Sequence, residues 1–392
     1  MTAEVDITIV GAGVIGCAVA RELAQAGREI FVIEKNSGIT RGENQSSRNS
    51  GVIHAGLYYD RSRRPLKAGL CAEGNTLLYR FCEQHGVPFR QTGKLVVAAN
   101  NEETAVLETY RARAIENGVP VQLVTGVRAA ELEPCVRAAA ALRLPTSGII
   151  NPTVLVHKLH LLAAENGAQF LTSTQVAGIK AHNEGLAVEI EYRDGARDTF
   201  LTKLLINAAG LYADEVARLV QPASAYQIDP VRSETMKFYR TKREDLMLQG
   251  MNVYPTPRQF ITPQGTYFSV GVHLTPTLTI DNKGNSPIGP EVTVGPLSRP
   301  AQHKDEYGGA YQPQEVFFNQ VRSFFPGLQE GDLMPHQTGI QARLAGYQDW
   351  VIEFSDDERR CLNLLGIDSP GLTGSLAIAR HVNELVKIQD LA

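Results

Sequence analysis

A strand–helix–strand pattern of apolar residues opens the chain. Residues 7–10 form a short apolar run rich in β-branched side chains, which is typical of a fully buried strand. Apolar residues then recur at helical spacing from 15 to 26, and Gly27 provides a stop for this helix. A second apolar run over 30–33 predicts another buried strand, so the first part of the chain is predicted to form a βαβ-type unit.

Three glycines with the spacing G-x-G-x-x-G separate the first predicted strand from the helix. Gly11 permits the tight turn, Gly13 lets the backbone approach a pyrophosphate, and Gly16 lets the helix pack closely on the strand. Glu34 follows Gly16 by 18 residues, where an acidic side chain meets the ribose hydroxyls of an adenosine. This order of elements predicts a dinucleotide site; an ordinary glycine-rich βαβ turn is the weaker alternative.

The remaining pattern contains both helices and strands. Helices are predicted at about 67–85, 102–117, 154–166 and 315–325. Strands are predicted at 93–99, in several runs between 168 and 206, and in several more between 229 and 333. Asp194 and Gly195 lie between two alternating runs and predict a β-hairpin. The segment 361–386 has the pattern of a strand, a glycine turn and a helix.

Length and composition narrow the class of protein. A chain of 392 residues exceeds what one core usually serves, so two domains are expected. The hydrophobic content of 43% and charged content of 20% are typical of a soluble globular protein, and a net charge of −4 gives no general reason to bind nucleic acid. Five scattered cysteines without C-x-x-C argue against a disulfide framework, and we expect no metal. No signal sequence or membrane-spanning run is evident, so we expect a cytoplasmic protein.

Several longer strings make the chain similar to a known family. They are RNSGVIHAGLYY (48–59), GKLVVAA (93–99), LLINAAGLYAD (204–214), GVHLT (271–275) and LLGIDSPGLTGSLAIA (364–379). With the N-terminal glycines, these strings resemble the glycine/D-amino-acid oxidase superfamily of FAD-dependent oxidoreductases. Within that superfamily, the chain resembles the L-2-hydroxyglutarate dehydrogenase/oxidase family over nearly its whole length.

The resemblance implies an α/β fold in two parts. A Rossmann-like FAD-binding domain would be built from the discontinuous segments 1–85, 146–222 and 334–392. A substrate domain with a mixed or antiparallel sheet flanked by helices would comprise 86–145 and 223–333.

The resemblance also implies FAD as the cofactor and a set of residues that hold it. Those expected to contact FAD are Gly11, Gly13, Val14, Ile15, Gly16, Glu34, Lys35, Ser47, Asn49, Ser50, Gly51, Val52, His54, Val176, Ala208, Gly210, Gly339, Arg343, Pro370, Gly371, Leu372 and Thr373. The glycine turn before the helix at Leu376 presents free N–H groups and a positive dipole end. Such a helix end favours the negative charge that a flavin gains on reduction.

No second G-x-G-x-x-G unit follows residue 210, so we expect the electrons to come from the substrate and not from a nicotinamide. The resemblance implies hydride transfer from the substrate Cα–H to flavin N5 while a base takes the hydroxyl proton. His54 and His273 are the candidate bases, because histidine titrates near neutral pH. Each of these histidines could instead have a structural role. A third interpretation of His54 is that it attaches the flavin covalently.

A dicarboxylate substrate needs cationic anchors, and arginine matches a carboxylate best. Arg343 and Arg232 are the predicted anchors, with Lys94 weaker and Tyr59 as a further substrate contact. The family string GIRPKL is represented here by GIQARL (339–344), so one positive charge is replaced by Gln341. The basic run RSRRPLK (61–67) is interpreted as a solvated loop.

The leading hypothesis is oxidation of a small 2-hydroxy acid, with L-2-hydroxyglutarate converted to 2-oxoglutarate. The alternatives are an amino-acid or amine oxidase and a glycerol-3-phosphate dehydrogenase-like flavoenzyme. A tRNA-modifying or redox-sensing flavoprotein is a weaker alternative, because the net charge is acidic. The electron acceptor is left open between oxygen, a membrane quinone and a redox protein, and quinone use implies peripheral association with the inner face of the cell membrane.

Overall fold

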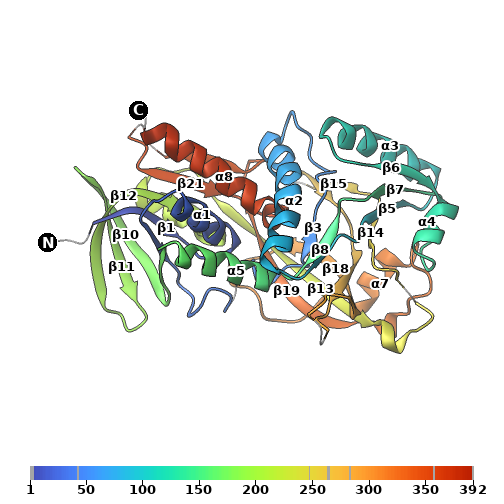
Figure 1. Cartoon of the computed structure of the whole chain (residues 1–392). Helices are drawn as coiled ribbons and strands as arrows, with labels where there is room; N and C mark the ends of the chain where they lie inside the picture. The colour runs from blue at the N-terminus through green and yellow to red at the C-terminus, as the bar shows by residue number, and fades with distance from the viewer. Residues whose placement is uncertain are drawn as a thin grey trace.

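Two bodies built on separate β-sheets lie side by side, with one long helix between them (Figure 1). This computed structural model describes residues 4–41, 44–246, 248–262, 265–281, 284–355 and 358–390.

The first sheet contains the predicted dinucleotide unit. Its strands are β1 (Glu4–Val10), β2 (Ile30–Ile33), β9 (Gln169–Leu171), β10 (Thr174–His182), β11 (Gly185–Tyr192), β12 (Arg197–Asn207), β20 (Val351–Phe354) and β21 (Cys361–Leu365). The order β10-β11-β12-β1-β2-β9 has parallel pairing from β12 to β9, with β21 also parallel to β12. The turn at Asp194 and Gly195 joins β11 to β12 as an antiparallel hairpin, which confirms the prediction.

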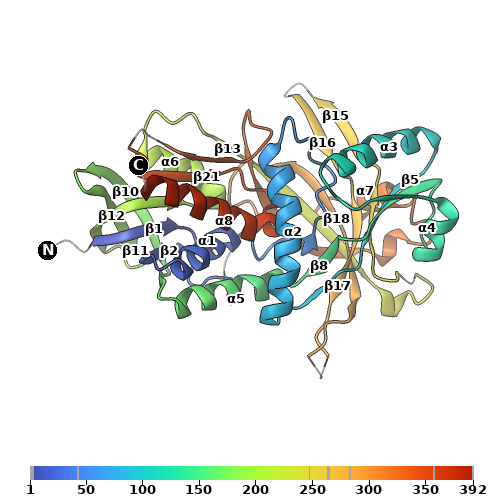
Figure 2. The ribbon, with the colours of Figure 1, turned by 45° about the horizontal axis from the view of Figure 1, so that its top comes forward.

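Three helices cover one face of this sheet: α1 (Val14–Gln25), α5 (Pro152–Glu165) and α8 (Gly371–Asp390). Figure 2 shows them side by side, with α1 between the other two and in contact with both. Their apolar side chains and those of β1 form one core in which Ile7, Ile9, Val19 and Leu23 are fully buried. Burial of these aliphatic side chains stabilises the unit by roughly 1.5–3 kcal/mol each.

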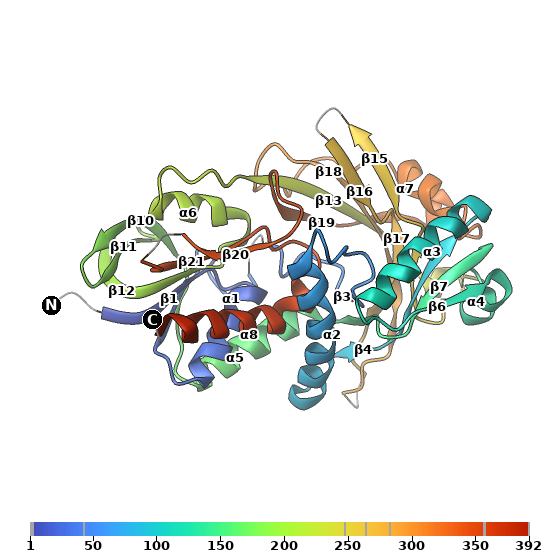
Figure 3. The ribbon, with the colours of Figure 1, turned by 90° about the horizontal axis from the view of Figure 1, so that it is seen from above.

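Local signals set the ends of several helices. Asn151 caps α5 by accepting a hydrogen bond from the Val154 N–H, and Pro152 occupies the first turn. The long helix α2 (Pro65–His85) likewise begins at a proline and ends at Gly86, which adopts the left-handed conformation. α2 packs against α8 and separates the two bodies (Figure 3).

The second sheet is mixed. Its strands are β5 (Lys94–Ala98), β6 (Gln122–Thr125), β7 (Ala140–Leu144), β13 (Ile228–Tyr239), β14 (Asn252–Pro255), β17 (His273–Leu278), β18 (Ile288–Pro300) and β19 (Met334–Leu344). They follow the order β19-β13-β18-β17-β14-β5-β7-β6, in which only the β14–β5 pair of these described strands is parallel. The predicted α/β fold with a second, mixed sheet is therefore confirmed.

Smaller elements complete both bodies and the junction between them. The helices are α3 (Asn101–Glu116), α4 (Gly126–Leu132), α6 (Ala213–Val220) and α7 (Gln314–Val321), with 3₁₀ turns at Gly210–Tyr212, Arg240–Lys242 and Glu330–Asp332. The short strands are β3 (Val52–Ile53), β4 (Phe89–Arg90) and β8 (Gly148–Ile150), and β15 (Arg258–Thr262) pairs with β16 (Gly265–Ser269).

Two boundaries differ from the sequence-based expectation. The helix predicted over 315–325 ends at Val321, because Phe325 precedes Pro326 and a residue before proline disfavours helical geometry. The division of the chain into domains stays a prediction. That prediction assigned residues 334–344 to the FAD-binding part. Hydrogen bonds between these residues and β13 instead place them in the second sheet.

Candidate active site

A cavity of about 1810 Å³ lies between the two sheets. It is larger than the roughly 300–1,000 Å³ of an ordinary small-molecule site, so it has room for a dinucleotide together with a substrate. One end is lined by the carboxyl ends of β1 and β2, and the other by residues of β13, β17 and β19. The carboxyl ends of parallel strands are the usual place for a ligand in such sheets.

The glycine-rich turn lines the first end of this cavity. Gly11 has φ +99°, and a Cβ there would lie 2.6 Å from the carbonyl oxygen of Ala208, so no larger residue fits. A Cβ on Gly16 would lie 1.9 Å from the carbonyl oxygen of Gly11, which is the close helix–strand packing that the spacing predicts. Gly13 lines the cavity, and the N–H of Val14 beside it donates to Ser46 Oγ at 2.9 Å.

Glu34 closes this end by bridging two backbone segments. Its carboxylate accepts hydrogen bonds from the N–H groups of Ala12 and Asn36, each at 2.8 Å. The side chain is buried but lines the cavity, so its remaining lone pairs are available to ribose hydroxyls. Lys35 follows it with the ammonium 3.3 Å from the ring centre of Tyr212.

Glu34→Gln should weaken FAD binding about tenfold and lower the free energy of unfolding of the apoprotein by roughly 1–3 kcal/mol. The amide NH₂ cannot accept either backbone N–H, so one donor loses its partner. FAD titration of the apoprotein, followed by flavin fluorescence, measures the first effect. Glu29→Gln, an exposed change of the same kind, is the matched control; equal affinity in both variants would contradict the assigned role.

The turn before α8 forms another part of the cavity wall. Gly366, Ile367, Asp368, Ser369, Pro370, Gly371 and Leu372 all line it. Thr373 lies behind this turn and is fully buried; its hydroxyl accepts a hydrogen bond from the His54 N–H at 3.0 Å. Thr373 therefore positions the segment after β3 that carries His54.

His54 lies against this turn. Its Nε2 is 3.3 Å from the hydroxyl of Ser369, and its carbonyl accepts a hydrogen bond from Asn75 Nδ2 at 2.9 Å. Burial and the nearby charges of Lys94 and His273 lower the pKa of His54 well below its usual value. The ring is therefore neutral at pH 7 and can accept a proton.

His273 and Lys94 both contact the ring of Tyr254. The rings of His273 and Tyr254 stack at 3.6 Å, and His273 Nδ1 is 3.0 Å from the carbonyl oxygen of Gly271. This contact assigns the hydrogen to Nδ1, which leaves Nε2 as an acceptor, and Nε2 has no hydrogen-bond partner among the described residues. Burial lowers the pKa of His273 to about 3.

Lys94 is buried with its ammonium 3.7 Å from the ring centre of Tyr254. It does not line the cavity, whereas Tyr254, Tyr58 and His273 around it do. Burial lowers the pKa of Lys94 to about 7. Lys94 thus acts on the cavity through the field of its charge, and the prediction that it contacts a substrate carboxylate finds no support in this geometry.

The surroundings of Arg232 differ from those expected of a substrate anchor. Its guanidinium is fully buried, donates to Glu234 at 2.7 Å and also donates to the carbonyls of Glu306 and Gly308. It does not line the cavity. Its charge is paired within the second body, which favours a structural role. The assignment of Arg232 as a substrate anchor stays a prediction that this geometry does not support.

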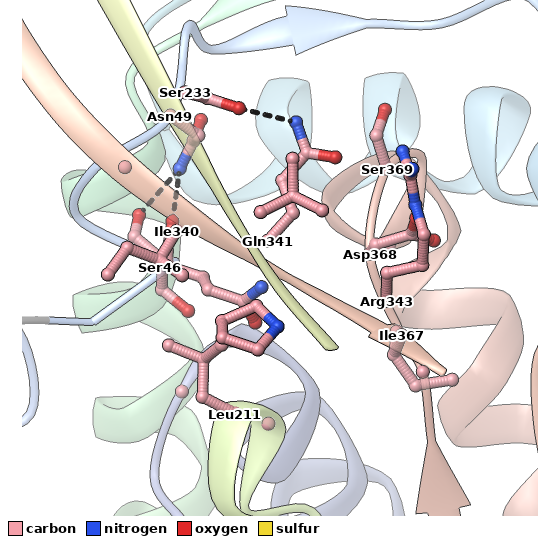
Figure 4. Close-up of a pocket in the computed structure, with 18 of the residues that line it drawn as sticks. Ser46, Asn49, Leu211, Ser233, Ile340, Gln341, Arg343, Ile367, Asp368 and Ser369 are labelled. Carbon is pink, nitrogen blue, oxygen red and sulfur yellow. Dashed lines mark hydrogen bonds between the residues drawn. The ribbon is translucent and has the colours of Figure 1, made fainter. Parts of the chain in front are cut away.

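Arg343 and Gln341 lie two residues apart on β19 and both face the cavity (Figure 4). The picture shows Arg343 next to Asp368 and Ser369, while Gln341 donates to Ser233 Oγ at 3.0 Å. Tyr59 also lines the cavity. Arg343 and Tyr59 therefore occupy the region in which the substrate was expected.

Most residues that the sequence predicted for FAD border this one space. They are Gly11, Gly13, Val14, Ile15, Glu34, Lys35, Asn49, Ser50, Val52, His54, Val176, Ala208, Gly210, Gly339, Arg343, Pro370, Gly371 and Leu372. The exceptions are Gly16, Ser47, Gly51 and Thr373, which do not line it. Gly51 is a packing glycine, because a Cβ there would lie 2.4 Å from the Ile150 carbonyl oxygen. Ser47 bonds to Asn44 instead. The roles of all these residues stay predictions.

Sequence reasoning missed four lining residues of chemical interest: Ser46, Arg64, Lys67 and Ser369. Ser369 lies in the string 364–379, which was noted for other residues, and Ser46 lies just before the string 48–59. The basic run was interpreted as solvated, which holds for Arg61 and Arg63. Lys67 instead pairs with Asp368 at 2.9 Å, and Arg64 is half-buried at the cavity wall.

Other features of the described residues limit the chemistry. None of their helices is both long and apolar enough to cross a membrane. None of the five cysteines, which all lie in the described part of the chain, forms a disulfide bond. No group of three or more histidine, cysteine or acidic side chains in the described part of the chain is arranged to hold a metal ion.

Comparison with known proteins decides the family. The family model described as FAD dependent oxidoreductase, DAO, matches residues 6–385. The chain belongs to this family. Its cofactor is FAD, and the protein is an FAD-dependent oxidoreductase.

Relatives in this family carry two kinds of name. The chain is 31% identical to the mitochondrial L-2-hydroxyglutarate dehydrogenase of Arabidopsis thaliana, over 97% of this chain and 83% of that protein. It is 29% identical to the glycerol 3-phosphate dehydrogenase of Caloramator mitchellensis, over 97% of this chain and 74% of that protein. Among solved structures, the FAD-bound L-alpha-glycerophosphate oxidase of Mycoplasma pneumoniae matches with a TM-score of 0.82 and 26% identity, covering 98% of this chain and 95% of that one.

The residues of this cavity fit FAD. A glycine turn that excludes any Cβ at Gly11 lines one end, and the Glu34 carboxylate beside it retains free lone pairs. The 366–372 turn and the start of α8 line another part of its wall. Backbone N–H groups at a helix start suit a group that gains negative charge on reduction.

Proposed function

We propose that this FAD-dependent oxidoreductase oxidises a small 2-hydroxy acid, with L-2-hydroxyglutarate converted to 2-oxoglutarate. The observation that carries the proposal is the meeting of a neutral histidine, His54, and a cationic side chain, Arg343, on the wall of the FAD cavity. Oxidation of a 2-hydroxy acid needs a proton acceptor for the hydroxyl and a cation for the carboxylate. The names of several relatives support the same substrate.

In this proposal each side chain has a defined task. Bound FAD accepts the two electrons that leave with the substrate Cα hydrogen. His54 takes the hydroxyl proton, and the contact of its Nε2 with the Ser369 hydroxyl holds the ring in place. Arg343 binds the carboxylate next to the reacting carbon, and the stacked rings of His273 and Tyr254 form a buried part of the cavity wall.

A second candidate substrate is glycerol 3-phosphate. Two of the compared proteins, a dehydrogenase and an oxidase, are named for this substrate or its equivalent. A cationic cavity wall suits a phosphate as well as a carboxylate. The amine and amino-acid oxidases among the solved structures are at most 20% identical and support the fold alone.

An anaerobic substrate panel tests the proposal. L-2-hydroxyglutarate should bleach the visible band of the bound flavin, while D-2-hydroxyglutarate, glycine and glycerol 3-phosphate should leave it oxidised. Bleaching by glycerol 3-phosphate alone would replace the first candidate by the second. Bleaching by amino acids alone would overturn both.

The same sample tests three further points. Reoxidation by oxygen, by a quinone analogue or only by an added redox protein identifies the electron acceptor. A quinone-specific reaction would support association with a membrane surface. Release of free flavin on acid precipitation is expected, because we propose His54 as the base and not as a covalent attachment point.

A further inference from the structure

A second hollow, of about 880 Å³, adjoins the FAD cavity. Its wall includes Arg63, Arg64, Arg113 and Arg258. Tyr58, Arg64 and Gln348 line both spaces, so these three side chains form the boundary between them. In Figure 1 the loop that leads into α2 lies beside α3, and the hollow is formed there.

The charge of this hollow is positive. Asp60 is the acidic residue among its described lining residues, and its carboxylate accepts from Ser62. Arg258 pairs with Glu103 at 3.0 Å, and Arg113 donates to the Tyr58 carbonyl. Arg63 and Arg113 both act on Asp60 and help to lower the pKa of its carboxyl group, so one carboxylate faces several arginines. Within the described residues, neither Arg63 nor Arg64 forms an ion pair.

Arg64 is the member of this group that faces both spaces. Its backbone is fixed, because its N–H donates to the Asp60 carbonyl at 2.7 Å and Pro65 begins α2 directly after it. Its side chain is half-buried, so the guanidinium is only partly hydrated. The FAD cavity contains the neutral Gln341 near Arg343, and Arg64 is one of the further cationic side chains that line it. It is also the arginine that the cavity shares with the second hollow.

We propose that this arginine-lined hollow is the entry site for a dianionic substrate, and that Arg64 binds the charged group far from the reacting carbon. The inference rests on the proposed function, because Arg343 must hold the carboxylate next to that carbon. The ligand chemistry is a small acid with two separated negative charges, either a dicarboxylate or a hydroxy-phosphate.

Electrostatics gives the hollow two separable effects. A surface recess lined by one sign of charge concentrates oppositely charged ligands and raises their association rate, and salt weakens this effect. A half-buried guanidinium that contacts a carboxylate adds a charge-assisted hydrogen bond. The first effect belongs to all four arginines, and the second belongs to Arg64 alone.

The experiment titrates the FAD-loaded protein with three non-reacting anions and follows the visible flavin spectrum. Glutarate has two carboxylates, butyrate has one, and inorganic phosphate probes the alternative ligand. Arg64→Gln should weaken glutarate binding about tenfold or more but butyrate binding less than threefold. Tighter binding of phosphate than of glutarate would identify the hydroxy-phosphate as the ligand.

Two more variants separate a local from a general effect. Arg63→Gln is exposed and should lower kcat/KM for the anionic substrate about threefold and flatten its dependence on salt, with kcat unchanged. Arg193→Gln removes the same charge from the exposed β11–β12 turn, at the far end of the first body, and should change neither quantity (Figure 1).

The outcomes distinguish this inference from the proposed function. Equal glutarate affinity in the wild type and Arg64→Gln would overturn the inference while L-2-hydroxyglutarate still bleaches the flavin. Failure of L-2-hydroxyglutarate to bleach, together with Arg64-dependent binding of phosphate, would overturn the proposed substrate and support the hollow. Equal weakening of glutarate and butyrate would show that Arg64 has no role in reading the second charge.

Discussion

Replacing His54 with glutamine is expected to slow flavin reduction by the substrate about 10²- to 10⁴-fold while the protein stays yellow. His54 borders the cavity with its Nε2 close to Ser369, and the neutral ring can accept the hydroxyl proton. Glutamine has similar reach but no basic nitrogen. Anaerobic stopped-flow absorbance measures the rate, and the flavin content of the purified protein shows that binding of FAD is retained.

The pH profile makes this prediction sharper. The lowered pKa of His54 means that flavin reduction by the wild type should persist below pH 6.5, the usual histidine value, and fall only in more acidic solution. His182→Gln, an exposed change on β10, is the control and should keep the wild-type rate. A rate in His54→Gln within threefold of wild type would transfer the role of the base to His273, which also lines this cavity and whose Nε2 has no hydrogen-bond partner among the described residues.

Replacing Lys94 with methionine is expected to raise the free energy of unfolding by several kcal/mol near neutral pH. The pKa of Lys94 is lowered from 10.5 to about 7 by burial, and each pKa unit corresponds to about 1.4 kcal/mol. Between these two pH values the unfolded chain binds more protons than the folded one. The wild type should therefore gain stability as the pH rises from about 7 to about 10.5, and the methionine variant should lack this gain.

Chemical denaturation at several pH values, with and without FAD, measures the Lys94 effect. Lys180→Met is the control, because Lys180 is exposed on β10 and its ammonium group loses little hydration when the chain folds. The activity provides a second measurement. Lys94 lowers the pKa of His54, so its removal should move the acidic fall of flavin reduction to higher pH. Parallel stability curves for wild type and Lys94→Met would contradict the buried charge.

Features encoded in adjacent residues were predictable. The dinucleotide unit depends on glycine spacing and on apolar runs within about thirty residues, and the structure places β1, α1 and β2 there. The hairpin at Asp194 and Gly195 is equally local. Such elements form from short-range geometry, so their positions follow from the sequence alone.

Features that depend on distant segments were not predictable in the same way. Arg232 looks like an anchor because its charge is visible, but Glu234 lies on the same face of β13 and neutralises it. Because residues two apart on a strand lie on the same face, this pairing could have been predicted from the sequence. Arg64 carries no such signal. Its place at the cavity wall arises only because the start of α2 packs between the two bodies, which no local pattern specifies.

The way in which α8 completes the cavity has a consequence for synthesis of the protein. The glycine turn of residues 11–16 is made first, but the 366–372 turn that forms another part of the cavity wall is made some 350 residues later. α8 also fills the groove between α1 and α2. A nascent chain that stops before residue 361 would lack α8 and the wall formed by residues 366–372. We therefore expect FAD to be bound only after this last unit has been translated.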